Sequence, residues 1–129
     1  MAAPEMPEGV LVQSTHVTDE GERAGWRVWA DGRHEGRRMG EGWIAGPPID
    51  PARMSELRAI LADPGVDAMA GRHEPAANRE HGSTLWFQVA RPGVPVTVEA
   101  LGGARVPELE ALHARLLPIL AGGGASAGS

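Results

Sequence analysis

Alternating and β-branched residues along the chain indicate several short strands. Residues 10–18 (VLVQSTHVT) and 84–91 (TLWFQVAR) have the clearest strand pattern, and residues 26–30 and 94–100 have shorter ones. Such period-two runs are typical of half-buried strands. Residues 33–39 hold few strand-forming residues, which favours an exposed edge strand or a loop, and residues 43–45 can add one short strand.

The joints between these segments carry turn residues. Asp31-Gly32 predicts a type I′ hairpin turn, whose two central residues both need positive φ. Pro92-Gly93 predicts the turn between residues 84–91 and 94–100. Pro95 lacks an N–H for a sheet ladder, so it favours an edge position or a bulge in the returning strand.

Apolar residues at helical spacing predict two helices. Asp50 can cap the first helix, with Pro51 at the first position, where a missing N–H costs nothing. Asp63-Pro64-Gly65 ends this helix, and residues 66–70 can form one more turn. A second helix opens at Pro107. The two apolar stripes are Met54, Leu57, Ile60 and Leu61, and then Leu109, Leu112, Leu116, Leu117 and Leu120.

The element order is therefore β-β-β(-β)-α-β-β-α, which predicts an α+β fold. We expect a mostly antiparallel sheet of four to six strands with two helices packed on one face. Residues 9–121 form a single domain in this interpretation. Residues 1–8 hold two prolines and no apolar period, which predicts a flexible N-terminus, and residues 122–129 are only Gly, Ala and Ser, which predicts a disordered tail.

Composition and charge narrow the function classes. The chain has no cysteine, which excludes disulfides, thiolate catalysis and zinc–thiolate sites. The net charge of −5 argues against a nucleic-acid partner, because phosphate neutralisation dominates that affinity. No apolar run reaches the roughly 20 residues of a membrane span, and the N-terminus lacks a signal-peptide pattern. We expect a cytoplasmic protein without a membrane partner.

No catalytic or metal-binding motif stands out. Ser14 and the other hydroxyl residues lie outside any Gly-x-Ser-x-Gly elbow, and no His-Glu-x-x-His pair is present. We therefore expect no enzymatic activity, no cofactor and no bound metal. The alternative is a small enzyme or metal-binding protein that uses His73 and His81 of the polar loop at residues 71–83. His113 lies beside a helix stripe, where a ring at the core boundary with satisfied nitrogens is expected.

Tryptophan is the most informative side chain in the sequence. The chain has four Trp, one Phe and no Tyr. Trp86 and Phe87 lie in the clearest strand, and one of the two should be in the core. Trp26 and Trp29 are three residues apart and therefore point to opposite faces of an ideal strand, one of them buried and the other exposed or at a rim.

Arginines surround the first tryptophans. Five of the twelve basic residues, all of which are arginine, lie in residues 23–38, and Trp and Arg are the residues most enriched at binding hot spots. The hairpin has two possible interpretations. It is either a protein-binding surface, or a structural hairpin with one tryptophan in the core, one at the edge and its arginines exposed to solvent. We interpret it as partner-binding, through Trp26, Trp29, Arg33, Arg37, Arg38 and Trp43. The alternative is a self-associating scaffold or assembly protein, so a homo-oligomer stays open.

Residues 49–120 resemble emfourin, a small bacterial inhibitor family of thermolysin-like metalloproteases. The resemblance lies in the helix "IDPARMSELRAILADPGVDAM", the hairpin "TLWFQVARPGVPVTVE" and the helix "VPELEALHARLLPIL". It implies a non-catalytic, cofactor-free, typically cytoplasmic protease inhibitor. The family's glycine-rich "GGF" segment after the first strand is missing, because residues 14–19 (STHVTD) stand in its place. No inhibitory residue is therefore carried over.

Overall fold

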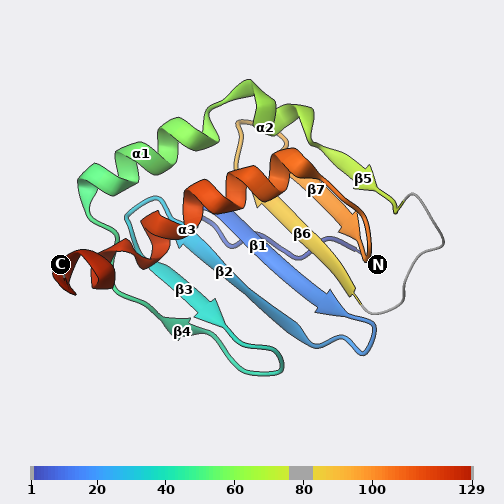
Figure 1. Ribbon diagram of the computed structural model, residues 1–129, viewed down its shortest axis with the longest axis horizontal. Helices are drawn as coiled ribbons and strands as arrows, with labels where there is room; N and C mark the ends of the chain where they lie inside the picture. Colours follow the sequence, from blue (N-terminus) through green and yellow to red (C-terminus); the bar gives the residue numbers. More distant parts are fainter. Residues whose placement is uncertain (1, 76–82, 129) are drawn as a thin grey trace.

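The computed structural model describes residues 2–75 and 83–128, and its strands form one seven-stranded sheet (Figure 1). Its strand order is β4-β3-β2-β1-β6-β7-β5. The strands are β1 (Val10–Thr18), β2 (Arg23–Trp29), β3 (His34–Arg37), β4 (Ile44–Ala45), β5 (Gly71–His73), β6 (Ser83–Val89) and β7 (Val96–Leu101). The helices are α1 (Pro51–Leu61), α2 (Pro64–Ala68) and α3 (Pro107–Gly128).

Aspartate caps start the first two helices. The carboxylate of Asp50 accepts a hydrogen bond from the Arg53 backbone N–H at 2.9 Å, and Asp63 accepts one from Gly65 at 2.8 Å. Each cap satisfies a backbone donor that the first helical turn leaves without a partner. The predicted apolar stripe of α1 is confirmed, since all four of its residues are buried.

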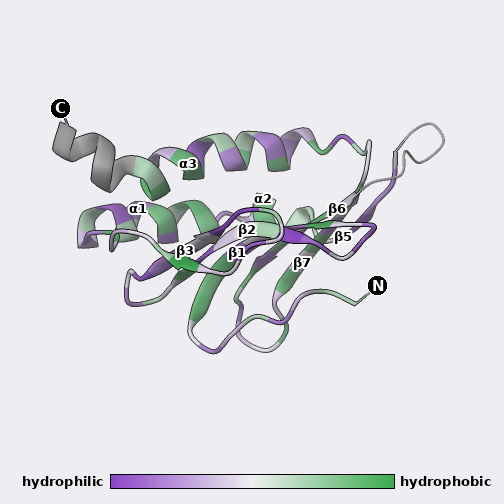
Figure 2. Cartoon of the chain, turned by 90° about the horizontal axis from the view of Figure 1, so that it is seen from below, coloured by the Kyte–Doolittle hydropathy of each residue, from purple (hydrophilic) through white to green (hydrophobic). Residues whose placement is uncertain are grey.

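The helices cover one face of the sheet, which we call the helix face (Figure 2). Its strand residues alternate along the chain, as a pleated strand requires. Phe87 lies in the centre of this face and is fully buried, as are Leu57 of α1 and Leu116 of α3. The main core therefore lies between the helices and the four central strands.

The first residues of the chain cross the opposite face of the sheet (Figures 1 and 2). We call residues 2–9 the N-terminal strap and this face the strap face. The side-chain amide of Gln13 donates to the Glu5 carbonyl at 3.0 Å, and that of Gln88 donates to the Pro4 carbonyl at 2.9 Å. Trp86 lies on this face and is buried.

The sequence predicted that one residue of the Trp86-Phe87 pair lies in the core, whereas both are buried. Phe87 packs against the helices, and Trp86 is enclosed on the strap face, so both side chains are buried. The strap residues that the sequence predicts to be flexible hold a described position on the sheet. Their mobility in solution stays a prediction.

The predicted α+β class is confirmed, but three details of the predicted architecture were wrong. The sheet has seven strands instead of four to six, and it is mixed, because β5 pairs parallel to β7. A third helix, α2, lies between α1 and β5. Helix α2 overlaps residues 66–70, for which the sequence predicts only one more turn, and β5 falls in the predicted polar loop. Three strand residues are too few for an alternation to be visible.

The turn after β2 also differs from the predicted type I′ turn. Among the described residues only glycines have positive φ, so Asp31 does not adopt the conformation that such a turn needs. Gly32 has a φ of 94°, its N–H donates to the Trp29 carbonyl, and the Trp29 N–H donates to the Arg33 carbonyl. The connection is a three-residue loop in which only Gly32 is left-handed.

Helix α3 uses a slightly different stripe from the predicted one. Leu109, Leu112 and Leu116 are buried as expected, but Ile119 is buried and Leu117 is exposed. Spacings of three and four residues keep Ile119 in line, whereas Leu117 is turned away. The helix extends to Gly128, into the tail whose disorder stays a prediction. Within the described residues, no helix is long and apolar enough to cross a bilayer.

Candidate functional site

Five side chains on the strap face of β2, β3 and the β3–β4 connection form an alternating stack of arginines and tryptophans. The guanidinium carbon of Arg27 lies 5.0 Å from the centre of the Trp29 ring and 3.9 Å from that of Trp43. Arg33 lies 4.7 Å from Trp29, and Arg37 lies 5.3 Å from Trp43. All four distances are within the range of cation–π attraction. We call this set, in the order Arg33, Trp29, Arg27, Trp43 and Arg37, the Arg–Trp stack.

The pairing of β2 with β3 fixes the centre of the stack. Arg27 is the register partner of Glu35, and its Nε and Nη2 atoms donate to Glu35 Oε1 at 3.0 and 2.8 Å. The two side chains are only 18% and 29% exposed. Glu35 therefore holds the guanidinium plane in place from one side while the two indole rings contact it from the others.

The turn after β2 positions the outer end of the stack. Arg33 donates from Nε to Asp31 Oδ2 at 3.0 Å, and its backbone N–H donates to Asp31 Oδ1 at 3.1 Å. The backbone hydrogen bond is the largest cause that lowers the pKa of the Asp31 carboxyl below its ordinary value, and the Arg33 charge acts in the same direction. The Arg33 side chain stays 64% exposed, so its remaining donors face solvent.

Charge is distributed unevenly between this region and the rest of the chain. Residues 23–43 contain five arginines against Asp31, Glu35 and Glu41, which gives a local charge of +2, while the whole chain carries −5. The other residues therefore sum to −7. A positive hairpin on an acidic protein orients that face towards acidic surfaces.

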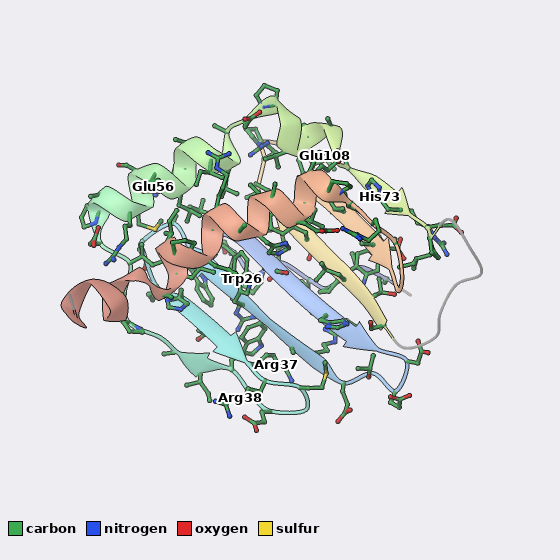
Figure 3. The ribbon with its side chains drawn as sticks, in the orientation of Figure 1. Trp26, Arg37, Arg38, Glu56, His73 and Glu108 are labelled. Atoms are coloured by element: carbon green, nitrogen blue, oxygen red, sulfur yellow. The ribbon has the colours of Figure 1, made fainter. Side chains whose placement is uncertain are left out.

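The structure brings together four of the six residues that the sequence singled out, namely Trp29, Arg33, Arg37 and Trp43. Trp26 lies on the helix face instead, with its ring edge-on to His113 at 6.1 Å (Figure 3). This confirms that Trp26 and Trp29 point to opposite faces. Arg38 lies beside Arg37 near the β3–β4 end of the sheet but outside the stack (Figure 3).

Two members of this site were missed by sequence reasoning. Arg27 and Glu35 join across strands, so their proximity depends on the register between β2 and β3. The alternation Arg27-x-Trp29 was a usable signal, because residues two apart on a strand share a face. Trp29 is buried, and it therefore supports the neighbouring arginines more than it contacts solvent.

A serine–histidine pair bears on the enzymatic alternative. Ser14 Oγ lies 3.2 Å from His113 Nε2, and His113 Nδ1 lies 3.2 Å from the Leu109 carbonyl. Because a carbonyl only accepts, Nδ1 carries the proton and Nε2 accepts from the serine hydroxyl. This pairing resembles a nucleophile with its base, and the ring nitrogens are satisfied as the sequence predicted.

The surroundings of this pair do not favour catalysis. Ser14 is 4% exposed, and the rings of Trp26 and Phe87 stand edge-on to His113. Burial lowers the pKa of His113, against a smaller opposite effect of its bond to Leu109. A hollow of about 280 Å³ between α2 and α3 is lined by other residues, including Val66, Met69, Glu108 and Arg115. The pair thus acts as a polar link between β1 and α3.

Residues 2–75 and 83–128 contain no cluster of metal ligands that would support the metal-binding alternative. No group of three or more possible ligands gathers there. His73 donates from Nε2 to the Met69 carbonyl at 2.7 Å, which ties β5 to the end of α2. His81, the second histidine of the suggested loop site, lies outside the described residues.

Comparisons with known proteins add no family assignment. Neither the models of known protein families nor the curated proteins gave a match to this chain. The resemblance to emfourin therefore remains an expectation from the sequence pattern.

Proposed function

We propose that this chain is a non-catalytic protein-binding module whose contact surface is centred on the Arg–Trp stack. The observation that supports this most directly is the continuous alternation of three arginines and two tryptophans on one face of the sheet. Trp and Arg are the residues that most often supply binding energy at protein interfaces.

Preorganisation strengthens this interpretation. A free arginine side chain loses much rotamer freedom when it binds, which reduces the net affinity. In this protein the guanidinium of Arg27 is already held by Glu35 and two rings, and those of Arg33 and Arg37 each rest on an indole. Such a surface suits a partner that presents carboxylates or backbone carbonyls, because arginine has donors and no acceptor.

The sequence pattern suggests a particular class of partner. The helix, hairpin and helix of residues 49–120 resemble emfourin in their sequence pattern. We therefore propose a thermolysin-like metalloprotease as the partner, with inhibition as the consequence of binding. The site on the inhibitor would be the Arg–Trp stack and the exposed residues around it.

An inhibition titration tests this proposal. Purified chain is added in steps to a thermolysin-like metalloprotease, including one from the source organism, at an enzyme concentration well above the expected Kd. A linear fall of activity to a one-to-one endpoint is the expected result. Full activity at a large excess of the chain would discard the protease as partner. A protease that binds without losing activity would retain the binding module but not the inhibitor.

Self-association is the second candidate, and one observation favours it. Strand β4 forms an edge of the sheet, and its Ile44 is 63% exposed. An apolar residue on a free edge can pair with a second copy, although a two-residue strand offers few hydrogen bonds. Light scattering at increasing protein concentration separates the two, because an edge-paired dimer raises the mass and Ile44→Lys reverses it.

A further inference from the structure

The strap face contains a second polar arrangement that the Arg–Trp stack does not use. Gln13 of β1 and Gln88 of β6 are register partners, and Gln13 Nε2 donates to Gln88 Oε1 at 2.8 Å. Each amide also donates once to the N-terminal strap, where the acceptors are two consecutive carbonyls, those of Glu5 and Pro4. Both glutamines are almost completely buried.

These contacts recognise main chain and not side chains. Each glutamine donates to a backbone carbonyl, so any segment with two free consecutive carbonyls can satisfy the pair. A helical segment cannot, because its carbonyls are used within the helix. Proline favours segments whose carbonyls stay free, and the strap contains Pro4 and Pro7.

The surrounding surface is unusually polar for a part of the protein that is buried. Thr15 and Trp86 are the next residues on the same face along β1 and β6, and they are buried with the two glutamines. The Trp86 indole nitrogen has no hydrogen-bond partner among the described residues. A face that only needed covering would be satisfied by apolar residues, whereas aligned amides and a free indole donor are the equipment of a peptide site.

The strap itself makes few specific contacts. Its Pro4 is buried, but Ala2, Ala3 and Glu5 are exposed. Its carbonyls accept four hydrogen bonds, from the Gln13 and Gln88 side chains and from the Val10 and Ala30 backbone N–H groups. Ordering eight residues costs about 1–2 kcal/mol of backbone entropy each, which these hydrogen bonds and one buried proline offset only in part. A segment held in this way can leave while the sheet and helices remain folded.

We infer that the Gln13–Gln88 pair is a binding site for a proline-containing, non-helical peptide segment of a partner protein, and that the N-terminal strap is its intramolecular occupant. The partner segment takes the place of the strap, with its proline at the position of Pro4 and two successive carbonyls on the glutamine amides. The inference does not rest on a binding role for the Arg–Trp stack or on any protease, although Gln13 is the register partner of Arg27.

A labelled peptide tests the inference on the full chain. The probe is a fluorescein-labelled peptide with the sequence of residues 2–9, and its anisotropy is followed during titration with protein. The wild type should bind weakly, because the tethered strap competes at a high effective concentration. The variant Pro4→Asp, which places a charge in the buried position, should bind the probe at least roughly tenfold more tightly.

Two controls make the outcome decisive. Adding Gln13→Ala and Gln88→Ala to the Pro4→Asp variant should abolish the gain, and a probe that itself carries Pro4→Asp should not bind. Absence of binding to a folded Pro4→Asp variant would overturn the inference. Unfolding of that variant would overturn it too, because the strap would then be a structural element that cannot exchange.

A measurement on the wild type guards against misinterpretation of the variants. Hydrogen exchange of the Gln13 and Gln88 side-chain amides should proceed through opening of the strap, with little dependence on urea. Exchange of these amides with the full urea dependence of global unfolding would contradict the inference, because it would mean that the strap leaves only when the whole protein unfolds.

Discussion

Replacing Arg27 tests whether the contacts within the Arg–Trp stack stabilise the folded protein. Arg27→Ala removes the contacts with Trp29 at 5.0 Å and Trp43 at 3.9 Å, together with the ion pair to Glu35. Each cation–π contact contributes about 0.5–1 kcal/mol. The ion pair is less than a third exposed and adds about 1 kcal/mol after allowance for solvent screening. The expected loss in the free energy of unfolding is about 2–3 kcal/mol.

Urea denaturation followed by circular dichroism measures this loss. Arg27→Met is the informative companion, because it keeps much of the aliphatic stem and removes the guanidinium group with its charge and its hydrogen-bond donors. We expect it to lose nearly as much stability as Arg27→Ala. Arg72→Ala is the control, since its ion pair with Glu74 spans 3.9 Å between exposed side chains and should contribute little.

A loss of stability for Arg27→Ala no larger than that for Arg72→Ala would contradict the claim that the Arg–Trp stack stabilises the fold. A double-mutant cycle of Arg27→Ala with Trp43→Ala adds a finer test. The cycle should give a coupling free energy of about 0.5–1 kcal/mol, and additive losses would show that the two side chains do not stabilise one another.

Three further predictions concern the stability of the sheet and helices that support the Arg–Trp stack. Because burial lowers the pKa of His113, the unfolded chain binds more protons than the native protein below the ordinary value of 6.5. The free energy of unfolding should therefore be constant at higher pH and fall as the pH drops from 6.5 towards the lowered native pKa. In a pH series of urea denaturations, His113→Gln should flatten this dependence. Gly25→Ala should cost about 3 kcal/mol or more by thermal unfolding, because its Cβ would lie 2.0 Å from the Ser14 carbonyl oxygen at a φ of 157°; loss of less than about 1 kcal/mol would contradict the described β1–β2 register. Phe87→Ala should cost about 3–5 kcal/mol in the same assay, while Ile44→Ala at the exposed edge should cost less than about 0.5 kcal/mol.

Local signals explain which parts of the fold could be predicted from the sequence. The Asp50-Pro51 cap and the apolar spacing of α1 are complete within a dozen residues, and the helix begins and ends close to where they indicate. Strand β1 matches its predicted range of residues 10–18 for the same reason. Features that depend on neighbours far along the chain were not visible, such as the parallel pairing of β5 with β7.

The residues of the candidate site were likewise only partly predictable from the sequence. The richness of the hairpin in Trp and Arg identified Trp29, Arg33, Arg37 and Trp43, but sequence spacing alone could not separate them from Trp26. Which face a residue occupies in β2 depends on where the helices pack. The ion pair of Arg27 with Glu35 depends on cross-strand register.

The burial of the strap face could not be predicted at all from local pattern. Residues 1–8 have the composition of a loose end, yet the carbonyls of Pro4 and Glu5 meet two glutamines that lie 75 residues apart in the chain. Gln13 and Gln88 look like solvent-facing strand residues in the sequence. They are buried because the strap crosses them.

The most direct test compares the affinity of the metalloprotease for three forms of this chain. The wild type, Arg33→Ala and Arg72→Ala are compared by inhibition titration with the metalloprotease of the source organism. Arg33 is exposed at the end of the stack, so its removal should leave the fold intact and raise the Kd at least about tenfold, whereas Arg72→Ala should bind like the wild type. Equal Kd values for all three forms would contradict the claim that the Arg–Trp stack is the contact surface.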